Sequence, residues 1–320
     1  MKAIFDIDFV VSWVDGKDPD WREKRAKFQR NPVPENRYRD YGLLKNWFER
    51  VWKYAPWVNN VFLVTDNQAP IWALSDDRIT IVNHTDFIPD DYLPTFNSSV
   101  IEMFLWNIKG LVEHFVYFND DMFLTNQVLP TDFFDKKGCP VLTGSLNSIS
   151  PTDDVSKNMF QNMILVNRLF DKKSLLNNPV KYLNVRYSFS NNVRTILNLP
   201  YTKWMGFYED HLAYPNLKSW FIKLNETNPN VFNQKGKHKF RHPEDYTIWL
   251  LKNMYLASGK FAPRHRGFGK VINVKSIEDI LIVKKSIANH KMIVVNDDIS
   301  DDEFEECIKY LRNALALTEL

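Results

Sequence analysis

The 320-residue chain has only two cysteines, Cys139 and Cys307, and they lie far apart in the sequence. They match no metal-ligand spacing, and two cysteines cannot form the disulfide framework of a small secreted protein. The chain also lacks an apolar run approaching the ~20 residues of a membrane span. Asp6, Asp8 and Asp15 interrupt the apolar stretch at the start, so we expect no signal peptide and a cytoplasmic protein.

Neither sign of charge dominates, because 41 Lys and Arg residues are balanced by 39 Asp and Glu residues. A nucleic-acid binder usually carries a concentrated basic excess, so we expect no nucleic-acid partner. Ten tryptophans and many basic residues leave room for a peripheral contact with the inner face of a membrane. With 44% hydrophobic residues, the chain can build a large core in one elaborated domain or in two closely packed ones.

Strand-like and helix-like segments alternate in the first half of the chain. Short apolar runs predict strands at residues 8–14, 60–65, 78–82 and 114–118. Residues 41–54 carry apolar side chains at the three- and four-residue spacing of a helix, and residues 98–110 form a second predicted helix. This order predicts an α/β fold in which helices flank both faces of a mostly parallel sheet.

The second half begins with an Asn-rich, weakly periodic segment, residues 148–201, which we interpret as a helical insertion or lid. Further helices are predicted from residue 211 to about 224 and from residue 243 to about 258. A final helix is predicted to begin with a capping box formed by Ser300 and Glu303.

Polar residues follow three of the predicted strands: Asp15, Asp66 and residues 119–121. Each Asp alone is more typical of a turn or a helix cap. Ligands, however, bind beyond the carboxyl ends of parallel strands, so these side chains are expected to converge on one crevice.

The stretch FVYFNDDMF ends a fully apolar strand in two adjacent carboxylates, Asp120 and Asp121. Adjacent carboxylates repel each other, so the pair either meets solvent or holds a metal ion. The stretch MIVVNDDIS repeats this pattern with Asp297 and Asp298, for which a turn before the last helix is the alternative. Carboxylate oxygens are hard ligands that suit Mg²⁺ or Mn²⁺.

Four strings of the sequence, VSWVDGKDP, APWVNNVFLVTDNQAP, LPTFNSSVIE and FVYFNDDMF, closely resemble conserved blocks of the Stealth family of sugar-1-phosphate transferases. Three later strings resemble its third and fourth blocks more loosely: EDHLAYPNL, KFRHPEDYTIWLLKNMYLASG and MIVVNDDIS. The family includes bacterial transferases of capsule and cell-wall polysaccharides. The resemblance implies a GT-A-like (Rossmann-like) fold that transfers hexose-1-phosphate from a UDP-sugar to a hydroxyl of a glycan or lipid-linked glycan, with Mg²⁺ or Mn²⁺ as cofactor.

The family blocks and the strand ends together assign five residues to the nucleotide-sugar pocket: Trp13, Asp15, Asp66, Asn97 and Glu102. Trp13 would wall the base and Asp15 would accept hydrogen bonds from ligand hydroxyls; a core indole and a turn residue are the alternatives. Asn97 and Glu102 flank a helix start, where amide groups favour phosphate. Ser99 and Glu102 fit an ordinary capping box equally well.

The resemblance also implies catalytic residues. His211 would take the proton of the acceptor hydroxyl, and the guanidinium fork of Arg241 would bind the diphosphate. Asp245 would orient the base or else lie in the first turn of a helix. Metal binding is expected at Asp120, Asp121, Asp297 and Asp298, and Asp121 is also expected to act in catalysis.

On this interpretation residues 1–147 form the nucleotide-sugar-binding half of the catalytic domain and residues 202–320 its second half. Three other functions fit parts of the sequence. An ordinary GT-A glycosyltransferase would use the same metal site and release UDP instead of UMP. A carbohydrate-binding protein would need no catalysis. The string AIFDIDFV, with Asp6 and Asp8, mimics the nucleophile loop of haloacid-dehalogenase-type phosphatases, although such short matches are common by chance.

Overall fold

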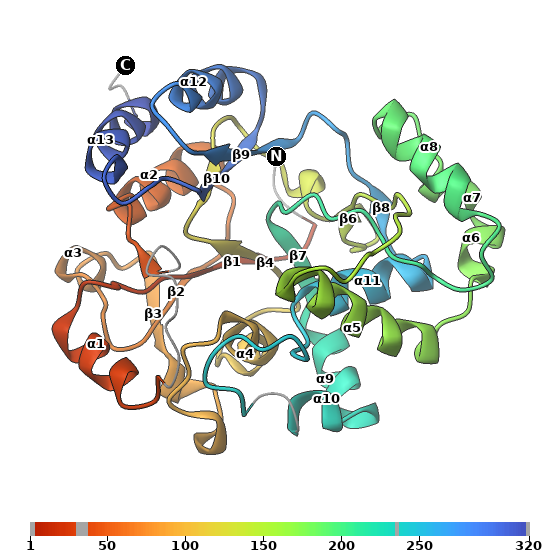
Figure 1. Cartoon of the computed structure of the whole chain (residues 1–320), viewed down its shortest axis with the longest axis horizontal. Helices are drawn as coiled ribbons and strands as arrows, with labels where there is room; N and C mark the ends of the chain where they lie inside the picture. The colour runs from red at the N-terminus through yellow and green to blue at the C-terminus, as the bar shows by residue number, and fades with distance from the viewer. Residues whose placement is uncertain (1–3, 30–37, 234–236, 318–320) are drawn as a thin grey trace.

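A five-stranded sheet with the strand order β3-β2-β1-β4-β7 forms the centre of the computed structural model, which describes residues 4–29, 38–233 and 237–317 (Figure 1). Its strands are Ile7–Ser12 (β1), Val61–Thr65 (β2), Ile79–Asn83 (β3), His114–Asn119 (β4) and Tyr214–Leu217 (β7). Strands β1 to β4 are parallel, and β7 is antiparallel to β4. The prediction of an α/β fold with a mostly parallel sheet is therefore confirmed.

Two smaller sheets lie beside the central one. Their strands are Met122–Leu124 (β5), Gly269–Val274 (β9) and Met292–Asp297 (β10) in one, and Val141–Leu142 (β6) and Ala262–Pro263 (β8) in the other. Strand β10 lies between antiparallel β5 and parallel β9. Only Asp120 and Asp121 separate β4 from β5, so this pair forms the turn between the central sheet and its neighbour.

Helices pack on both sides of the sheets, as predicted. In Figure 1, α2, α12 and α13 lie on one side of the central strands, and α4, α9 and α10 lie on the other. The longer helices are Pro19–Ala26 (α1), Leu44–Tyr54 (α2), Ser98–Phe104 (α4), Asp154–Leu169 (α5), Phe189–Asn198 (α8), Lys218–Thr227 (α9), Trp249–Ser258 (α11), Asp279–Asn289 (α12) and Phe304–Leu315 (α13). Short helices are Ile71–Leu74 (α3), Lys173–Asn177 (α6), Pro179–Tyr182 (α7) and Asn230–Asn233 (α10).

The aromatic part of the core lies directly behind the Asp120–Asp121 turn. The ring of Phe118 at the end of β4 lies 4.8 Å from that of Phe9 and 5.4 Å from that of Trp47, between ring centroids. Trp47 on α2 also donates its indole N–H to the carbonyl oxygen of Met122, at 2.8 Å. These buried contacts fix the turn between two sheets and one helix.

Two helix predictions in the second half are wrong at their N-terminal ends. The helix predicted from residue 211 begins only at Lys218, because the preceding residues pair with β4 as strand β7. Pro215 is tolerated there because β7 is an edge strand. The helix predicted from Pro243 begins at Trp249. In both places tertiary pairing and loop contacts, which local periodicity does not report, determine the boundary.

The capping box predicted at Ser300 and Glu303 is wrong, and the capping-box alternative for Ser99 and Glu102 does not form. Helix α4 is capped instead by Asn97, whose side-chain oxygen accepts a hydrogen bond from the N–H of Ser99 at 3.1 Å. Helix α13 has Glu303 at its N-cap position without a side-chain cap, and Ser300 precedes it in a turn. Glu102, free of a capping role, is buried.

The segment 148–201 is mostly helical, as predicted, and contains α5 to α8. Helix α5 packs against α11 and is hydrogen-bonded to the loop before it: Asn158 donates to the carbonyl oxygen of His242 at 2.7 Å, and Asn162 donates to the hydroxyl of Thr247 at 2.9 Å. This part of the insertion is therefore joined to the body of the protein. A lid function for the segment stays a prediction.

Candidate active site

The polar residues that follow the parallel strands lie at one edge of the central sheet. Ser12, the last residue of β1, is in register with Val64 of β2 and with Asn119 of β4. Asp15, Asp66 and the Asp120–Asp121 turn therefore extend beyond the same edge. This is the edge where α/β sheets bind ligands.

Asp120 and Asp121 are partly buried neighbours in the sequence and in the structure. Burial, with the negative charges of Asp121 and Asp40, raises the pKa of Asp120 to about 8. Burial also raises the pKa of Asp121, although the positive charges of His211 and Arg241 act in the opposite direction. Oδ1 of Asp121 is buried and accepts no hydrogen bond from the described residues. An unpaired carboxylate oxygen beside a second carboxylate fits a hard divalent cation such as Mg²⁺ or Mn²⁺.

Asp297 ends strand β10, whose Val295 N–H donates to the backbone oxygen of Asp121 at 3.0 Å. Arg39 binds the Asp297 carboxylate with two hydrogen bonds, of 2.8 Å from Nε and 2.7 Å from Nη2. Burial raises the pKa of Tyr41, and the negative charges of Asp297, Asp121 and Asp120 raise it further. Asp298 is exposed, and its N–H donates to a β9 carbonyl at 3.0 Å. Ligation by Asp297 or Asp298 stays a prediction, and Asp297 would have to share its carboxylate with Arg39.

Asp40 is a site residue that sequence reasoning missed. Its charge contributes to the raised pKa of Asp120, and its Oδ1 accepts hydrogen bonds from the Trp13 indole at 3.3 Å and from the N–H of Gly42 at 3.0 Å. The half-buried Trp13 thus contacts Asp40, and its role as a pocket wall stays a prediction. An Asp two residues before a Gly is typical of a turn, so nothing in the local sequence marks Asp40.

His211 has a left-handed backbone, with φ of 45°. Its Nδ1 lies 2.9 Å from the hydroxyl of Tyr214, which also accepts a hydrogen bond from the Trp249 indole at 2.8 Å. Such a φ is uncommon for a residue with a side chain, and it persists only where the surroundings hold it. The charge of His211 opposes the rise in the pKa of Asp121, so we include this imidazole in the candidate site.

A buried ionic network holds the His211 backbone. Glu209 accepts the His211 N–H at 2.8 Å, and Lys252 of α11 contacts both Glu209 oxygens at 3.1 Å. Lys252 also lies 2.7 Å from Asp210, which Arg264 contacts at 3.3 Å. The charges of Lys252 and Arg264 hold the pKa of Asp210 below its usual range, despite the opposing effect of burial. Sequence reasoning missed this network, because its members come from separate elements.

Arg241 lies between the N-terminus of α4 and the carboxylate pair. Its guanidinium donates to Oγ of Ser98 from Nε at 3.2 Å and from Nη2 at 2.9 Å. Its charge lowers the pKa of both Asp121 and Glu102. Burial nevertheless raises the pKa of Glu102 to about 7, and this carboxyl accepts the N–H of Ile248 at 3.4 Å. A basic group and a titratable acid thus lie next to the predicted metal ligands.

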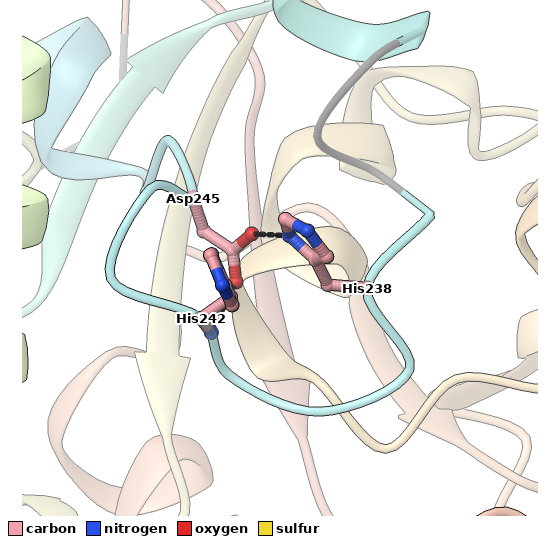
Figure 2. Close-up of side chains that lie close together, drawn as sticks. All are labelled: His238, His242 and Asp245. Atoms are coloured by element: carbon pink, nitrogen blue, oxygen red, sulfur yellow. Dashed lines mark hydrogen bonds and ion pairs between the residues drawn. The ribbon is translucent and has the colours of Figure 1, made fainter.

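The loop that carries Arg241 is held by Asn97 and Asp245, and Figure 2 shows Asp245 with His238 and His242. The Asn97 amide donates to a carboxylate oxygen of Asp245 at 2.7 Å and to the carbonyl oxygen of His238 at 3.2 Å. Asp245 also accepts from the His238 ring at 2.6 Å and from the N–H of His242 at 2.8 Å. Asn97 and Asp245 are buried and bonded to protein groups. These bonds fit a positioning role for both residues, and contact of Asn97 with a nucleotide sugar stays a prediction.

His238, His242 and Asp245 also form the one group of three candidate metal ligands in the described part of the chain, with ligand atoms within 4.8 Å of one another. The two imidazoles stack with centroids 4.1 Å apart. Both oxygens of Asp245 already accept hydrogen bonds from protein donors. A metal ion would have to displace these bonds, so support of the loop is the role that the geometry favours.

Asp15 and Asp66 make local contacts. Oδ1 of Asp15 accepts the N–H of Lys17 at 2.8 Å in a turn. Asp66 forms an ion pair with Lys24 and lies 3.9 Å from the ring of His84. Both remain at the predicted edge of the sheet, and their contact with a nucleotide sugar stays a prediction.

The phosphatase alternative conflicts with the position of Asp8. This residue is buried at the amino end of β1, whereas ligands bind at the carboxyl end. Its carboxylate accepts hydrogen bonds from the side chain of Asn59 at 2.9 Å and from the N–H groups of Asn60 at 3.0 Å and Val112 at 2.9 Å. Asp8 therefore joins loops at the edge of the sheet opposite to the one where ligands bind.

Two conserved regions of Stealth proteins match this chain, region 1 over residues 5–31 and region 2 over residues 37–142. The chain is 41% identical to the exopolysaccharide phosphotransferase cps2G of Lactiplantibacillus plantarum, over 97% of this chain and 93% of that protein. It is 36% identical to the capsular polysaccharide phosphotransferase WcwK of Streptococcus pneumoniae, over 96% of this chain and 93% of that protein. Among solved structures, it is similar to the galactosyltransferase LgtC in complex with donor and acceptor sugar analogues, with a TM-score of 0.42 and 10% identity over 98% of this chain and 97% of that chain.

Proposed function

Because the chain belongs to the Stealth family of polysaccharide phosphotransferases, we propose that it transfers hexose-1-phosphate from a UDP-sugar to a hydroxyl of a glycan or lipid-linked glycan. The products are a phosphodiester in a cell-surface polysaccharide and UMP. The observation that carries the proposal is the Asp120–Asp121 turn at the carboxyl edge of the sheet, where the charges of His211 and Arg241 act on Asp121. Phosphoryl transfer needs a cation clamp and basic groups around the phosphates more than covalent catalysis.

Asp120 and Asp121 are the residues that would hold Mg²⁺ or Mn²⁺. When bound, the ion neutralises charge on the diphosphate. Arg241 presents two N–H groups of its planar fork to Ser98, and the same geometry suits two phosphate oxygens. Glu102, buried close to Arg241, helps to keep that guanidinium in place.

His211 is the proposed general base. When its Nδ1–H donates to the Tyr214 oxygen, Nε2 is free to take the proton of the acceptor hydroxyl. The acceptor oxygen then forms a bond to the β-phosphorus, and the bond between that phosphorus and the bridging oxygen of UMP breaks. The bond between sugar C1 and its oxygen stays intact.

The donor side of the site is proposed at the edge beyond β1 and β2. Trp13 would wall the uracil, and Asp15 would accept hydrogen bonds from ligand hydroxyls. Both follow β1, and Trp13 contacts Asp40 next to the carboxylate pair. Asp66 would complete this part of the pocket.

The experiment that tests the proposal uses a UDP-hexose labelled with ³²P in the phosphate next to the sugar, together with Mg²⁺ and a glycan acceptor. The label is expected in the glycan, and the released nucleotide is expected to be UMP. Label that leaves as UDP would identify a glycosyltransferase. Glycan binding without any turnover, unchanged in an Asp121→Asn variant, would identify a carbohydrate-binding protein.

A further inference from the structure

Helix α8 presents its apolar side to solvent. Phe189, Val193, Ile196 and Leu197 are 82%, 36%, 53% and 68% exposed. Their spacing of four, three and one residues places them on one helical face. A surface helix of a globular protein normally packs this face against the core, so α8 has the reverse orientation.

The opposite, polar side of α8 faces the protein. Asn191, Thr195 and Asn198 are buried, at the same helical spacing. The Thr195 hydroxyl accepts the N–H of Leu146 at 3.0 Å, and the Asn198 side-chain oxygen accepts the hydroxyl of Ser148 at 2.8 Å. Since a buried polar group without a partner is costly, these bonds specify the orientation of the helix. The fold therefore holds the apolar face of α8 toward solvent through these hydrogen bonds.

Further exposed apolar residues lie on α6 and α7 and in the segments before and after α8. We define the α8 surface as Leu176, Val180, Val185, Phe189, Val193, Ile196, Leu197, Leu199, Tyr201 and Met205. These ten side chains are nearly half of the exposed large hydrophobic side chains in the described part of the protein. Figure 1 shows α6, α7 and α8 together at one edge of the molecule, opposite α1 and α3. Apolar exposure gathered in this way marks an interaction site.

The charged residues of this segment are all basic. Residues 172–208 contain no Asp or Glu, although acidic and basic residues are almost balanced over the whole chain. The segment contains six basic residues: Lys172, Lys173, Lys181, Arg186, Arg194 and Lys203. Four of them, Lys173, Arg186, Arg194 and Lys203, are exposed. An apolar face with surrounding Lys and Arg residues matches the acyl chains and phosphate groups of an anionic lipid surface.

We propose that the α8 surface docks on the anionic face of a lipid bilayer. Phe189 and Leu197 enter the boundary between headgroups and acyl chains, and Arg186 and Arg194 contact lipid phosphates. Within the described residues, no helix has both the length and the apolar character needed to cross a membrane, so the contact lies in the plane of the interface. The docking itself does not depend on the reaction proposed above.

The test is sedimentation of the full chain with vesicles of phosphatidylcholine alone or mixed with phosphatidylglycerol. The wild type should bind the mixed vesicles, and a Phe189→Ser/Leu197→Ser variant should bind them at least about tenfold more weakly. An Ile71→Ser/Leu281→Ser variant is the matched control, because these side chains are 87% and 70% exposed outside the α8 surface. It should bind like the wild type, and both variants should melt at the wild-type temperature.

A separate variant tests the contact between the basic residues and the lipid phosphates. An Arg186→Gln/Arg194→Gln variant should bind mixed vesicles more weakly and with a smaller dependence on salt. The proposal is overturned if the wild type does not bind mixed vesicles, or if the Phe189→Ser/Leu197→Ser variant binds them equally well. It is also overturned if the wild type forms a dimer in vesicle-free solution that this variant abolishes, since the occupant would then be a second copy of the chain.

Discussion

At the scale of single residues, Asp120 and Asp121 combine two acidic groups with burial, which disfavours their charged form. Replacement of Asp121 or Asp120 by Asn keeps the shape of the side chain but removes a negative charge from the predicted cation site. We expect UMP release in the presence of Mg²⁺ to fall at least about 100-fold in either variant, because neutralisation of the diphosphate fails. The melting temperature should stay equal or rise, since burial disfavours the charged form of both side chains and the substitution removes one titratable group.

An Asp302→Asn variant is the control for this prediction, because Asp302 is an exposed carboxylate. Its turnover should equal that of the wild type. A large loss of thermal stability in Asp121→Asn would instead assign the pair a structural role, and full turnover in excess chelator would exclude a metal-dependent reaction.

Arg241 provides a second test at this scale. An Arg241→Lys variant keeps the positive charge but loses the planar guanidinium. In the wild type this group contacts Ser98 with two N–H groups. We expect kcat/KM for the donor to fall about 10- to 100-fold, although the substitution is formally conservative. Arg22→Lys, at another exposed arginine, should leave the kinetics unchanged. Kinetics like those of the wild type for Arg241→Lys would place Arg241 outside the site.

The site residues differ in how well the sequence reveals them. Asp120 and Asp121 end an apolar strand, and this local pattern alone indicates them. Asp40 and Lys252 give no such signal, because an Asp near a Gly is typical of a turn and a Lys on a helix is usually exposed. Only the folded chain brings Asp40 to Asp120 and Lys252 to Glu209.

At the scale of elements, the ionic network between α11 and the loop before β7 should carry stability as well as alignment. Lys252 is 3% exposed and contacts Glu209 and Asp210. A Lys252→Met variant leaves the partly buried Glu209 carboxylate without a cation, whereas Asp210 keeps Arg264, so we expect a loss of about 3 kcal/mol in the free energy of unfolding. Urea unfolding at neutral pH measures it.

The same variant should also lower kcat, because Glu209 holds the His211 backbone in its left-handed conformation. Lys173→Met is the control, since Lys173 is exposed and its removal should change the free energy of unfolding by less than about 1 kcal/mol. An equally small change in Lys252→Met would show that the network contributes little to the fold.

The elements themselves were predictable where local pattern and packing agree. The four parallel strands β1 to β4 and the helices α2 and α4 follow apolar periodicity, and their predicted types are confirmed, whereas α1 and α3 were not predicted. Strand β7 was missed because an edge strand with Pro215 has little pattern of its own, and pairing with β4 forms it. Helix α8 was predicted as a helix, but periodicity alone would place its apolar face inward, whereas the hydrogen bonds of Thr195 and Asn198 place it outward.

At the scale of the whole molecule, stability should depend on pH through a buried histidine next to the sheet edge. Burial lowers the pKa of His84 to about 4, although the charge of Asp66 opposes the shift. In the unfolded chain its pKa is about 6.5, so between these values the unfolded state binds a proton that the folded state does not. The stabilising contribution is therefore complete above about pH 6.5 and is lost as the pH falls toward 4.

This shift predicts a difference between the wild type and a His84→Gln variant, which cannot titrate. Between pH 7 and pH 4.5, the free energy of unfolding from urea titrations should fall by about 2–3 kcal/mol more in the wild type than in His84→Gln. His265→Gln removes an exposed histidine and should follow the wild type at both pH values. If all three proteins lose stability equally, the acid sensitivity of the fold comes from its carboxylates, since the titration of His84 would then be the same in the folded and unfolded chains.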